Sequence, residues 1–108
     1  MIGVYCKDLF FGAKIGETAK QLGLDAVFLE SVEDAHGIHF YIVDLNYPGV
    51  MVKKLIPGIK EREEATIIAF GSHVNVELLE EAKELGADLV FTRSEFSDKL
   101  PDLLQGRW

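Results

Sequence analysis

The stretch "FYIVDLNYPGV", residues 40–50, decides the fold of this chain. It begins with an apolar run, stops at Asp44, and then enters a turn rich in Asn, Pro and Gly over residues 46–49. An almost unbroken apolar run of this length is typical of a strand that is buried on both faces, as the strands of a parallel sheet are. We therefore expect residues 39–44 to form a buried strand whose last residue is a carboxylate.

Short apolar runs recur along the rest of the chain and alternate with segments of helical period. The runs predict strands at residues 2–6, 26–29, 39–44, 66–70 and 89–92. This alternation is typical of a three-layer α/β architecture, in which helices cover both faces of a parallel sheet. Right-handed crossovers then predict a doubly wound, five-stranded, flavodoxin-like sheet with the strand order 2-1-3-4-5.

Apolar residues spaced by about four predict the helices between these strands. Three patterns are clear: Phe11 to Leu22, Leu78 to Leu85 with Asn75 or Ser72 as N-cap, and Phe96 to Leu104 with Ser94 as N-cap and Gly106 at the end. Two segments are weaker, because residues 31–35 can form only about one turn and a helix over residues 50–56 is expected to end or kink at Pro57–Gly58.

Length and composition predict a single domain over residues 1–108. The chain is 48% hydrophobic and 27% charged, as globular proteins are, and no apolar run approaches the roughly 18 residues of a membrane span. We see no basic leader before the first strand, and the lone Cys6 suits a reducing compartment. We therefore expect a cytoplasmic protein that does not contact a membrane.

The net charge of −7 argues against a nucleic-acid partner. Eleven Lys and Arg residues are scattered among eighteen acidic residues, so no basic stripe is present to neutralise phosphates. The mixed charge runs are typical of solvated helix faces.

The predicted strand order indicates where chemistry can take place. In an open parallel sheet, the functional crevice lies at the carboxyl ends of the strands, beside the point where the winding reverses, here between the first and third strands. The residues that follow those ends are Cys6, Lys7 and Asp8, then Asp44 and Asn46, then Gly71, Ser72 and His73, and finally Arg93 and Ser94.

These residues resemble the receiver domains of two-component response regulators over nearly the whole chain. "IVDLNYPG" is similar to the receiver strand that ends in the phosphoacceptor aspartate, and "IIAFGSHVNVELLEEAKELGADLVFTRSEF" is similar to the later half of that domain. The resemblance implies a CheY-like fold and a phosphoryl group received from a histidine kinase. It also implies Mg²⁺ held by that aspartate and by an acidic pair after the first strand.

Carried over by position, the resemblance assigns a role to each residue of the predicted edge. Asp44 falls on the phosphoacceptor, and Ser72, or Gly71 without a gap, falls on the switch hydroxyl. Arg93 falls where the family has a lysine, and it replaces a compact ammonium with a planar fork. Asp8 and Asp44 are the expected ligands of a weak Mg²⁺ site.

The first strand departs from the family pattern, because Lys7–Asp8 stands where receivers carry two adjacent acids. If the ammonium of Lys7 reaches the crevice, it pairs with Asp44 and repels the metal ion. If Lys7 points away, the weak metal site survives. We favour a degenerate pseudo-receiver without phosphotransfer, and both orientations of Lys7 stay open.

Three further residues have no assigned role in a reaction. Leu9 and Phe10 lie in the loop beside the predicted crevice, where we expect apolar side chains to pack over the site, with a contact surface as the alternative. Trp108, at the end of the chain, is a candidate anchor for a partner. Cys6 has the pattern of a small buried hydrophobe, although a thiol near Lys7 could be reactive.

Three functions remain open. The first is a non-enzymatic signalling or regulatory module that acts through a protein partner or self-association, with Lys7, Phe10 and Trp108 as binding residues and no cofactor. The second is a working receiver that is phosphorylated on Asp44 with Mg²⁺. The third is a flavodoxin-like domain that binds a small molecule, for instance an anion near residues 72–75.

Overall fold

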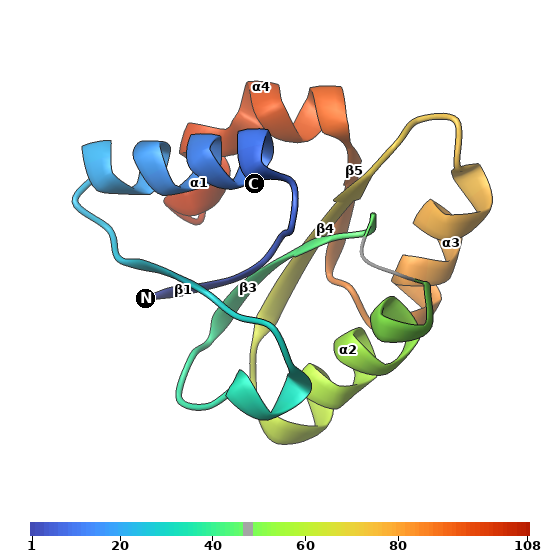
Figure 1. Ribbon diagram of the computed structural model, residues 1–108. Coiled ribbons are helices and arrows are strands. Elements are labelled where there is room, and N and C mark those ends of the chain that lie inside the picture. The colour runs from blue at the N-terminus through green and yellow to red at the C-terminus, as the bar shows by residue number, and fades with distance from the viewer. Residues whose placement is uncertain (47–48) are drawn as a thin grey trace.

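The computed structural model describes residues 1–46 and 49–108. Its five strands form one parallel sheet with the order β2-β1-β3-β4-β5, which confirms the predicted topology (Figure 1). The strands are β1 (Ile2–Tyr5), β2 (Ala26–Phe28), β3 (Phe40–Asp44), β4 (Thr66–Gly71) and β5 (Leu89–Thr92). The predicted strands overlap these bounds and differ from them by at most one residue at an end.

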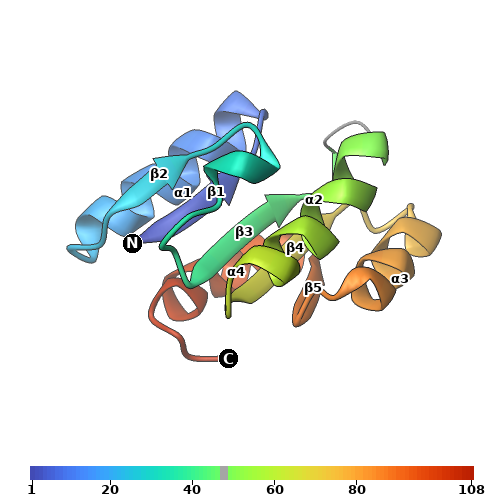
Figure 2. The same cartoon turned by 90° about the horizontal axis from the view of Figure 1, so that it is seen from below.

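Helices cover both faces of the sheet. In Figures 1 and 2, α1 (Leu9–Gln21) and α4 (Arg93–Leu104) lie on one face, and α2 (Gly49–Arg62) and α3 (Val76–Leu85) lie on the other. The link between β2 and β3 contains only a 3₁₀ turn, η1 (Val32–Asp34), as the short segment predicted. No helix in the described part of the chain is long and apolar enough to cross a membrane.

Alternating strand residues divide the core into two halves. Ile42 and Phe70 face α1 and α4, where Phe96 stacks on Phe70 with ring centroids 4.3 Å apart. Tyr41 and Val43 face the other half of the core, which α2 and α3 cover. Because both faces of β3 are buried, its apolar side chains follow one another without alternation.

The last helix begins earlier than the sequence predicted. Its N-cap is Thr92 and not Ser94, because the hydroxyl of Thr92 accepts a hydrogen bond from the Glu95 amide at 3.2 Å, while the Glu95 carboxylate accepts one from the Thr92 amide at 2.9 Å. This reciprocal pair forms a capping box. As a result, Arg93 is the first residue of α4 and does not belong to a loop.

Of the two expectations for Pro57–Gly58, an end of the helix or a kink, the end is wrong, because α2 continues to Arg62. Pro57 removes one backbone hydrogen bond. The apolar residues on both sides of it, Val52, Leu55, Ile56 and Ile59, are nevertheless fully buried against the sheet, and we attribute the continuity of the helix to this packing. The turn expected at Pro48 lies outside the described residues, and Gly49 begins α2.

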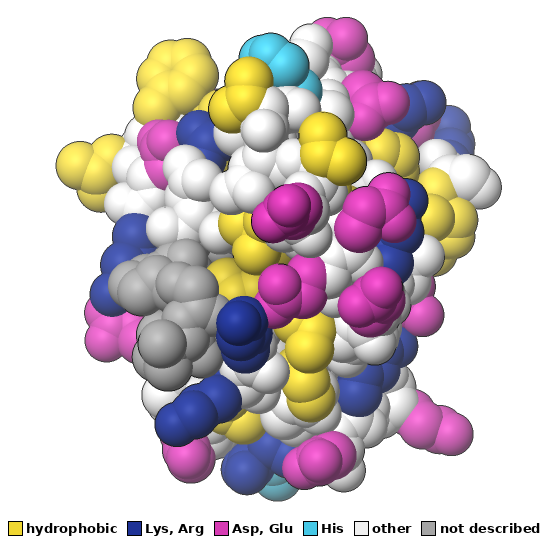
Figure 3. All heavy atoms as spheres, turned by 90° about the vertical axis from the view of Figure 1, so that its right-hand side faces the viewer, with side chains coloured by type: hydrophobic (Ala, Val, Ile, Leu, Met, Phe, Trp, Pro, Cys, Tyr) yellow, Lys and Arg dark blue, Asp and Glu magenta, His cyan; other side chains and the backbone are white. Residues whose placement is uncertain are grey.

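Acidic side chains gather on the side of the molecule that carries α3. Figure 3 views this side and shows acidic groups beside exposed apolar ones.

Candidate functional site

Three charged residues meet at the carboxyl edge of the sheet, between the N-terminal ends of α1 and α4. Asp44 is the last residue of β3, Asp8 is the N-cap of α1, and Arg93 is the first residue of α4. Cys6 follows β1 and lies against Asp44. The structure thus brings together four of the residues that strand order placed at one edge.

Asp44 is a buried carboxylate whose two oxygens both have partners. Its side chain is 2% exposed. Oδ1 accepts a hydrogen bond from the Asn46 amide at 2.9 Å and lies 3.5 Å from a terminal nitrogen of Arg93. Oδ2 accepts one from the thiol of Cys6 at 3.6 Å. The surrounding protein therefore contacts both oxygens that would bind a metal ion or attack a phosphoryl group.

Arg93 bridges the two acids. One terminal nitrogen lies 3.5 Å from Asp44 and the other lies 3.4 Å from Oδ2 of Asp8. The guanidinium carbon lies 5.2 Å from the ring centroid of Phe11, which places the cation over an aromatic face. Both distances exceed the usual 2.7–2.9 Å of charge-assisted hydrogen bonds, so the bridge is electrostatic and loosely fitted.

Asp8 is committed to the helix as well as to Arg93. Its Oδ1 accepts hydrogen bonds from the backbone amides of Phe10 and Phe11, at 2.9 and 3.1 Å, and so caps α1. The backbone amide of Phe11, then that of Phe10 and the guanidinium of Arg93, lower the pKa of the Asp8 carboxyl. Asp8 is thus ionised at neutral pH and is fixed in orientation.

At Asp44 and Cys6, burial raises the pKa, in contrast to the lowered pKa of Asp8. Loss of hydration raises the pKa of Asp44, although the Asn46 amide and Arg93 act to lower it. Burial, together with the negative charge of Asp44, raises the pKa of the Cys6 thiol to about 12. Cys6 is therefore a protonated hydrogen-bond donor, and a reactive thiolate is not favoured there.

The carboxylate oxygens that a Mg²⁺ ion would need here already contact protein groups. The ion needs a near-octahedral set of oxygens and is usually held by carboxylates with waters or phosphate. Here Asp8 and Asp44 share a guanidinium, and their oxygens accept hydrogen bonds from backbone amides and a thiol. Within residues 1–46 and 49–108, no cluster of three or more His, Cys, Asp or Glu side chains could hold a metal.

The residues predicted for the switch position lie at the next strand. Gly71 ends β4 beside Thr92 in register, and Ser72 follows it. The hydroxyl of Ser72 accepts a hydrogen bond from the Val74 amide at 3.3 Å, so it stabilises the turn before α3.

A cation from α4 lies beside Asp44. Arg93 is within ion-pair distance of both acids. Lys7, one of the cations considered for this position, has an exposed side chain in the loop before α1.

Two apolar residues beside the site are exposed. Leu9 and Phe10, on the first turn of α1, are 89% and 76% exposed. They do not close over the carboxylates, which was the expected packing. Phe10 contacts Phe11 edge to face, with centroids 6.2 Å apart, and thereby adjoins the ring beneath Arg93.

Trp108 lies at the other end of the sheet. Its ring packs against Phe40, with centroids 5.7 Å apart, and is 57% exposed. Phe40 begins β3 and Asp44 ends it, so Trp108 is not part of the Asp44 site. It lines a separate hollow of about 320 Å³, with Leu89, Phe91, Lys99, Asp102, Leu103 and Arg107.

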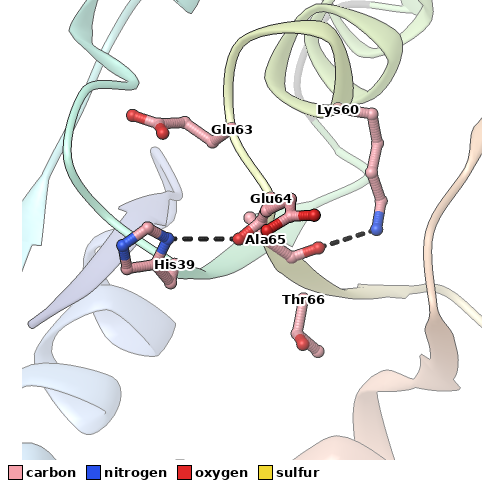
Figure 4. Close-up of a pocket in the computed structure, with 6 residues that line it drawn as sticks. All are labelled: His39, Lys60, Glu63, Glu64, Ala65 and Thr66. Atoms are coloured by element: carbon pink, nitrogen blue, oxygen red, sulfur yellow. Dashed lines mark hydrogen bonds between the residues drawn. The ribbon is translucent and has the colours of Figure 1, made fainter.

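A hollow of about 550 Å³ lies at the amino-terminal edge of the sheet, and its polar groups stabilise a turn of the fold. Figure 4 shows His39 and Lys60 directed at the turn between α2 and β4. His39 Nδ1 lies 3.1 Å from the Glu64 carbonyl, and the Lys60 ammonium donates to the Ala65 carbonyl at 2.7 Å and to Asp88 at 2.6 Å. These contacts hold the turn and leave the carboxyl edge as the better candidate site.

Sequence reasoning missed two contacts of the site. The thiol of Cys6 donates to Asp44, and Phe11 lies beneath Arg93. The alternation of side chains along the strands could have predicted the first contact. Ile2, Val4 and Ile42 face α1 and α4, and Cys6 and Asp44 follow at the same two-residue spacing, so they lie on that side as well.

Comparison with known proteins gives the fold and nothing finer. No protein-family model and no curated protein sequence matches the chain. Solved structures do match. The chemotaxis response regulator CheY4 of Vibrio cholerae is 15% identical, with a TM-score of 0.78 over 99% of this chain and 97% of that one.

Two further solved structures carry ions. The receiver domain of the sensor histidine kinase PA1611 from Pseudomonas aeruginosa, with magnesium coordinated in its active-site cleft, has a TM-score of 0.79 at 16% identity, over 97% of this chain and 93% of that one. A response regulator from Burkholderia pseudomallei, with a phosphorylated aspartic acid, calcium and citrate, has a TM-score of 0.77 at 16% identity. That match covers 96% of this chain but only 65% of the longer protein. The chain therefore has the CheY-like fold of response-regulator receiver domains.

Proposed function

We propose that this chain is a signalling or regulatory module with a receiver fold that acts through protein contacts and does not accept a phosphoryl group. The observation that carries the proposal is the bridge of Arg93 between Asp8 and Asp44, at 3.4 and 3.5 Å. It supports a pseudo-receiver in which a side chain stands where receivers place a metal ion. On this proposal the chain is cytoplasmic, is not an enzyme and needs no cofactor.

The chemistry of phosphoryl transfer explains why the bridge matters. Transfer to a carboxylate needs an oxygen that can attack in line, with cations that neutralise the charge of the phosphoryl group. Asp44 is 2% exposed, and both of its oxygens already have partners. A donor would have to displace Arg93 or Cys6 and bring in a divalent ion against the guanidinium charge.

The exposed residues beside the bridge are the proposed contact surface. A large exposed aromatic side chain next to a charged site is typical of a residue that a partner covers. Phe10 fits this description, the exposed Leu9 adjoins it on the first turn of α1, and Lys7 adds an exposed cation in the loop before that helix. Trp108, at the opposite end of the sheet, is a second proposed anchor, either for another protein or for self-association.

Intact mass spectrometry tests the absence of phosphotransfer. The protein is incubated with acetyl phosphate and Mg²⁺ beside the Asp44→Asn variant, and circular dichroism shows that both are folded. We expect no phosphoryl adduct on either protein. An adduct on the parent that is missing from Asp44→Asn would overturn the proposal and identify Asp44 as a working phosphoacceptor.

A further inference from the structure

A groove between α2 and α3 lies on the side of the molecule that Figure 3 shows. It has a volume of about 560 Å³. Its lining consists of Lys53 from α2 and of Val76, Glu77, Glu80, Glu81, Glu84 and Leu85 from α3. Neither the bridge at Asp44 nor the hollow at Trp108 shares a residue with it.

One wall of the groove is acidic along its whole length. Glu77, Glu80, Glu81 and Glu84 recur every three or four residues, so they share one face of α3. Two of them have cations nearby, since Glu81 lies 3.7 Å from Lys53 and Glu80 lies 3.6 Å from Lys83. Within the described part of the chain, no ion pair is formed by Glu77 or Glu84.

The ends of this wall are apolar. Val76, the first residue of α3, is 60% exposed, and Leu85, the last one, is half-buried against the core. An exposed apolar side chain beside unpaired carboxylates favours a ligand that supplies both an apolar contact and positive charge.

Charge excludes two of the possible occupants. A second copy of this chain would bring another net charge of −7 to a wall that already carries four glutamates. Nucleic acid would bring phosphates to the same carboxylates. A cationic segment of a different protein is attracted by the same glutamates that repel a second copy of the chain and nucleic acid.

We propose that the groove between α2 and α3 binds a basic, amphipathic helical segment of a partner protein. A helix rises about 1.5 Å per residue, so Glu77 and Glu84 are about 10 Å apart along α3. Lys or Arg residues with the same spacing on a helix that lies along the groove face these carboxylates, and an apolar residue on the same face covers Val76. The proposal rests on the proposed function and names the class of partner.

Binding of a model peptide tests the proposal. The probe is a fluorescently labelled amphipathic helix of Leu and Lys, about 15 residues long, which is enough to form a helix. A scrambled peptide of the same composition removes the amphipathic face, and a peptide with Glu in place of Lys reverses the charge. Fluorescence anisotropy at low ionic strength gives the Kd of each peptide.

Variants of exposed side chains locate the binding. Glu77→Gln combined with Glu84→Gln, and separately Val76→Ser, alter the groove without touching the core. The matched control combines Glu17→Gln with Asp98→Asn, which removes two exposed acids from α1 and α4 on the other face. We expect the double glutamine variant to raise the Kd about threefold to tenfold, as the loss of two exposed charge pairs does.

The outcomes separate this inference from the proposed function. Preferred binding of the Leu and Lys helix, weakened in both groove variants and unchanged in the control, supports it. Equal binding of the scrambled peptide, or equal Kd values in the groove and control variants, overturns it. Neither outcome depends on whether Asp44 accepts a phosphoryl group, which the mass measurement decides by itself.

Discussion

Replacing Arg93 with alanine tests the reasoning about the site most directly. The change removes the guanidinium that lies 3.5 Å from the buried Asp44 and 3.4 Å from Asp8, and it removes the cation over the ring of Phe11. Asp44 then keeps its burial but loses the cation beside it. We expect the folded state to be destabilised because a buried carboxylate is left without its counter-ion.

The magnitude follows from the geometry. Breaking a fully buried ion pair costs about 3–5 kcal/mol, and a cation over an aromatic ring adds about 0.5–1 kcal/mol. The bridge falls short of that case, because Arg93 is 26% exposed and its distances are longer than those of strong hydrogen bonds. We therefore expect the free energy of unfolding to fall by about 2 kcal/mol at neutral pH, with a loss of roughly 10 °C in Tm.

The deficit should depend on pH. Burial raises the pKa of Asp44 in the folded protein, so ionised Asp44 opposes folding at any pH above that pKa. Without Arg93 the pKa of Asp44 rises further, and ionised Asp44 destabilises the folded state more. As the pH falls through the raised pKa, Asp44 becomes neutral and no longer needs a cation. The difference between the parent and Arg93→Ala is therefore largest at neutral pH and shrinks in acid.

Urea unfolding, followed by circular dichroism at several pH values, measures this deficit. Arg93→Lys serves as the matched control, because it keeps the charge but cannot bridge both acids, and we expect about half the loss. Adding Asp44→Asn to Arg93→Ala should recover stability, with a coupling of about 1 kcal/mol in the double-mutant cycle. A deficit below about 0.5 kcal/mol, a deficit that is constant with pH, or an additive cycle would refute the electrostatic role of the bridge.

Three further predictions concern single residues. Because the pKa of the Cys6 thiol is raised from 9.0 to about 12, alkylation by iodoacetamide at pH 8 should be roughly a thousandfold slower in the folded protein than in urea; similar rates would contradict the buried hydrogen bond. Gly71→Ala places a methyl group 3.2 Å from Cβ of Leu45 and should lower the free energy of unfolding by about 1 kcal/mol, whereas a neutral result in urea would show that Leu45 moves aside. Pro57→Ala restores a backbone donor inside α2 and should raise the free energy of unfolding, measured in urea, by about 1 kcal/mol; a lower free energy of unfolding would mean that the proline ring is needed for packing.

Most of the fold could be predicted from the sequence because the residues of both core halves form short apolar runs along the chain. Each strand run is followed by polar or glycine residues, so its position was clear to within one residue at each end. The helix boundaries were harder. Pro57 is a strong local stop signal, but burial of the apolar face that includes Ile56 and Ile59 outweighed it. Local propensity cannot predict this outcome, because the burial that outweighs the proline depends on tertiary packing.

The members of the site were predicted, but the ion pairs of Arg93 were not. Strand order placed Asp8, Asp44 and Arg93 at one edge, whereas the contact of Arg93 with both acids was not foreseen. That contact follows from the start of α4. With Ser94 as N-cap, Arg93 would have been a loop residue, but the capping box of Thr92 places it on the first helical turn, where its guanidinium reaches both acids.

The proposed role of Arg93 also limits how such a module can be regulated. An ion that exchanges with solvent lets the charge of a site change with metal or phosphoryl occupancy. A guanidinium is covalently attached and stays protonated at every physiological pH, so the charge between Asp8 and Asp44 is constant. On this proposal, a signal cannot enter through the carboxyl edge and has to come from what binds the exposed surfaces. Two measurements therefore belong together. Mass spectrometry tests whether Asp44 accepts a phosphoryl group, and the peptide titration tests whether the groove between α2 and α3 binds a partner.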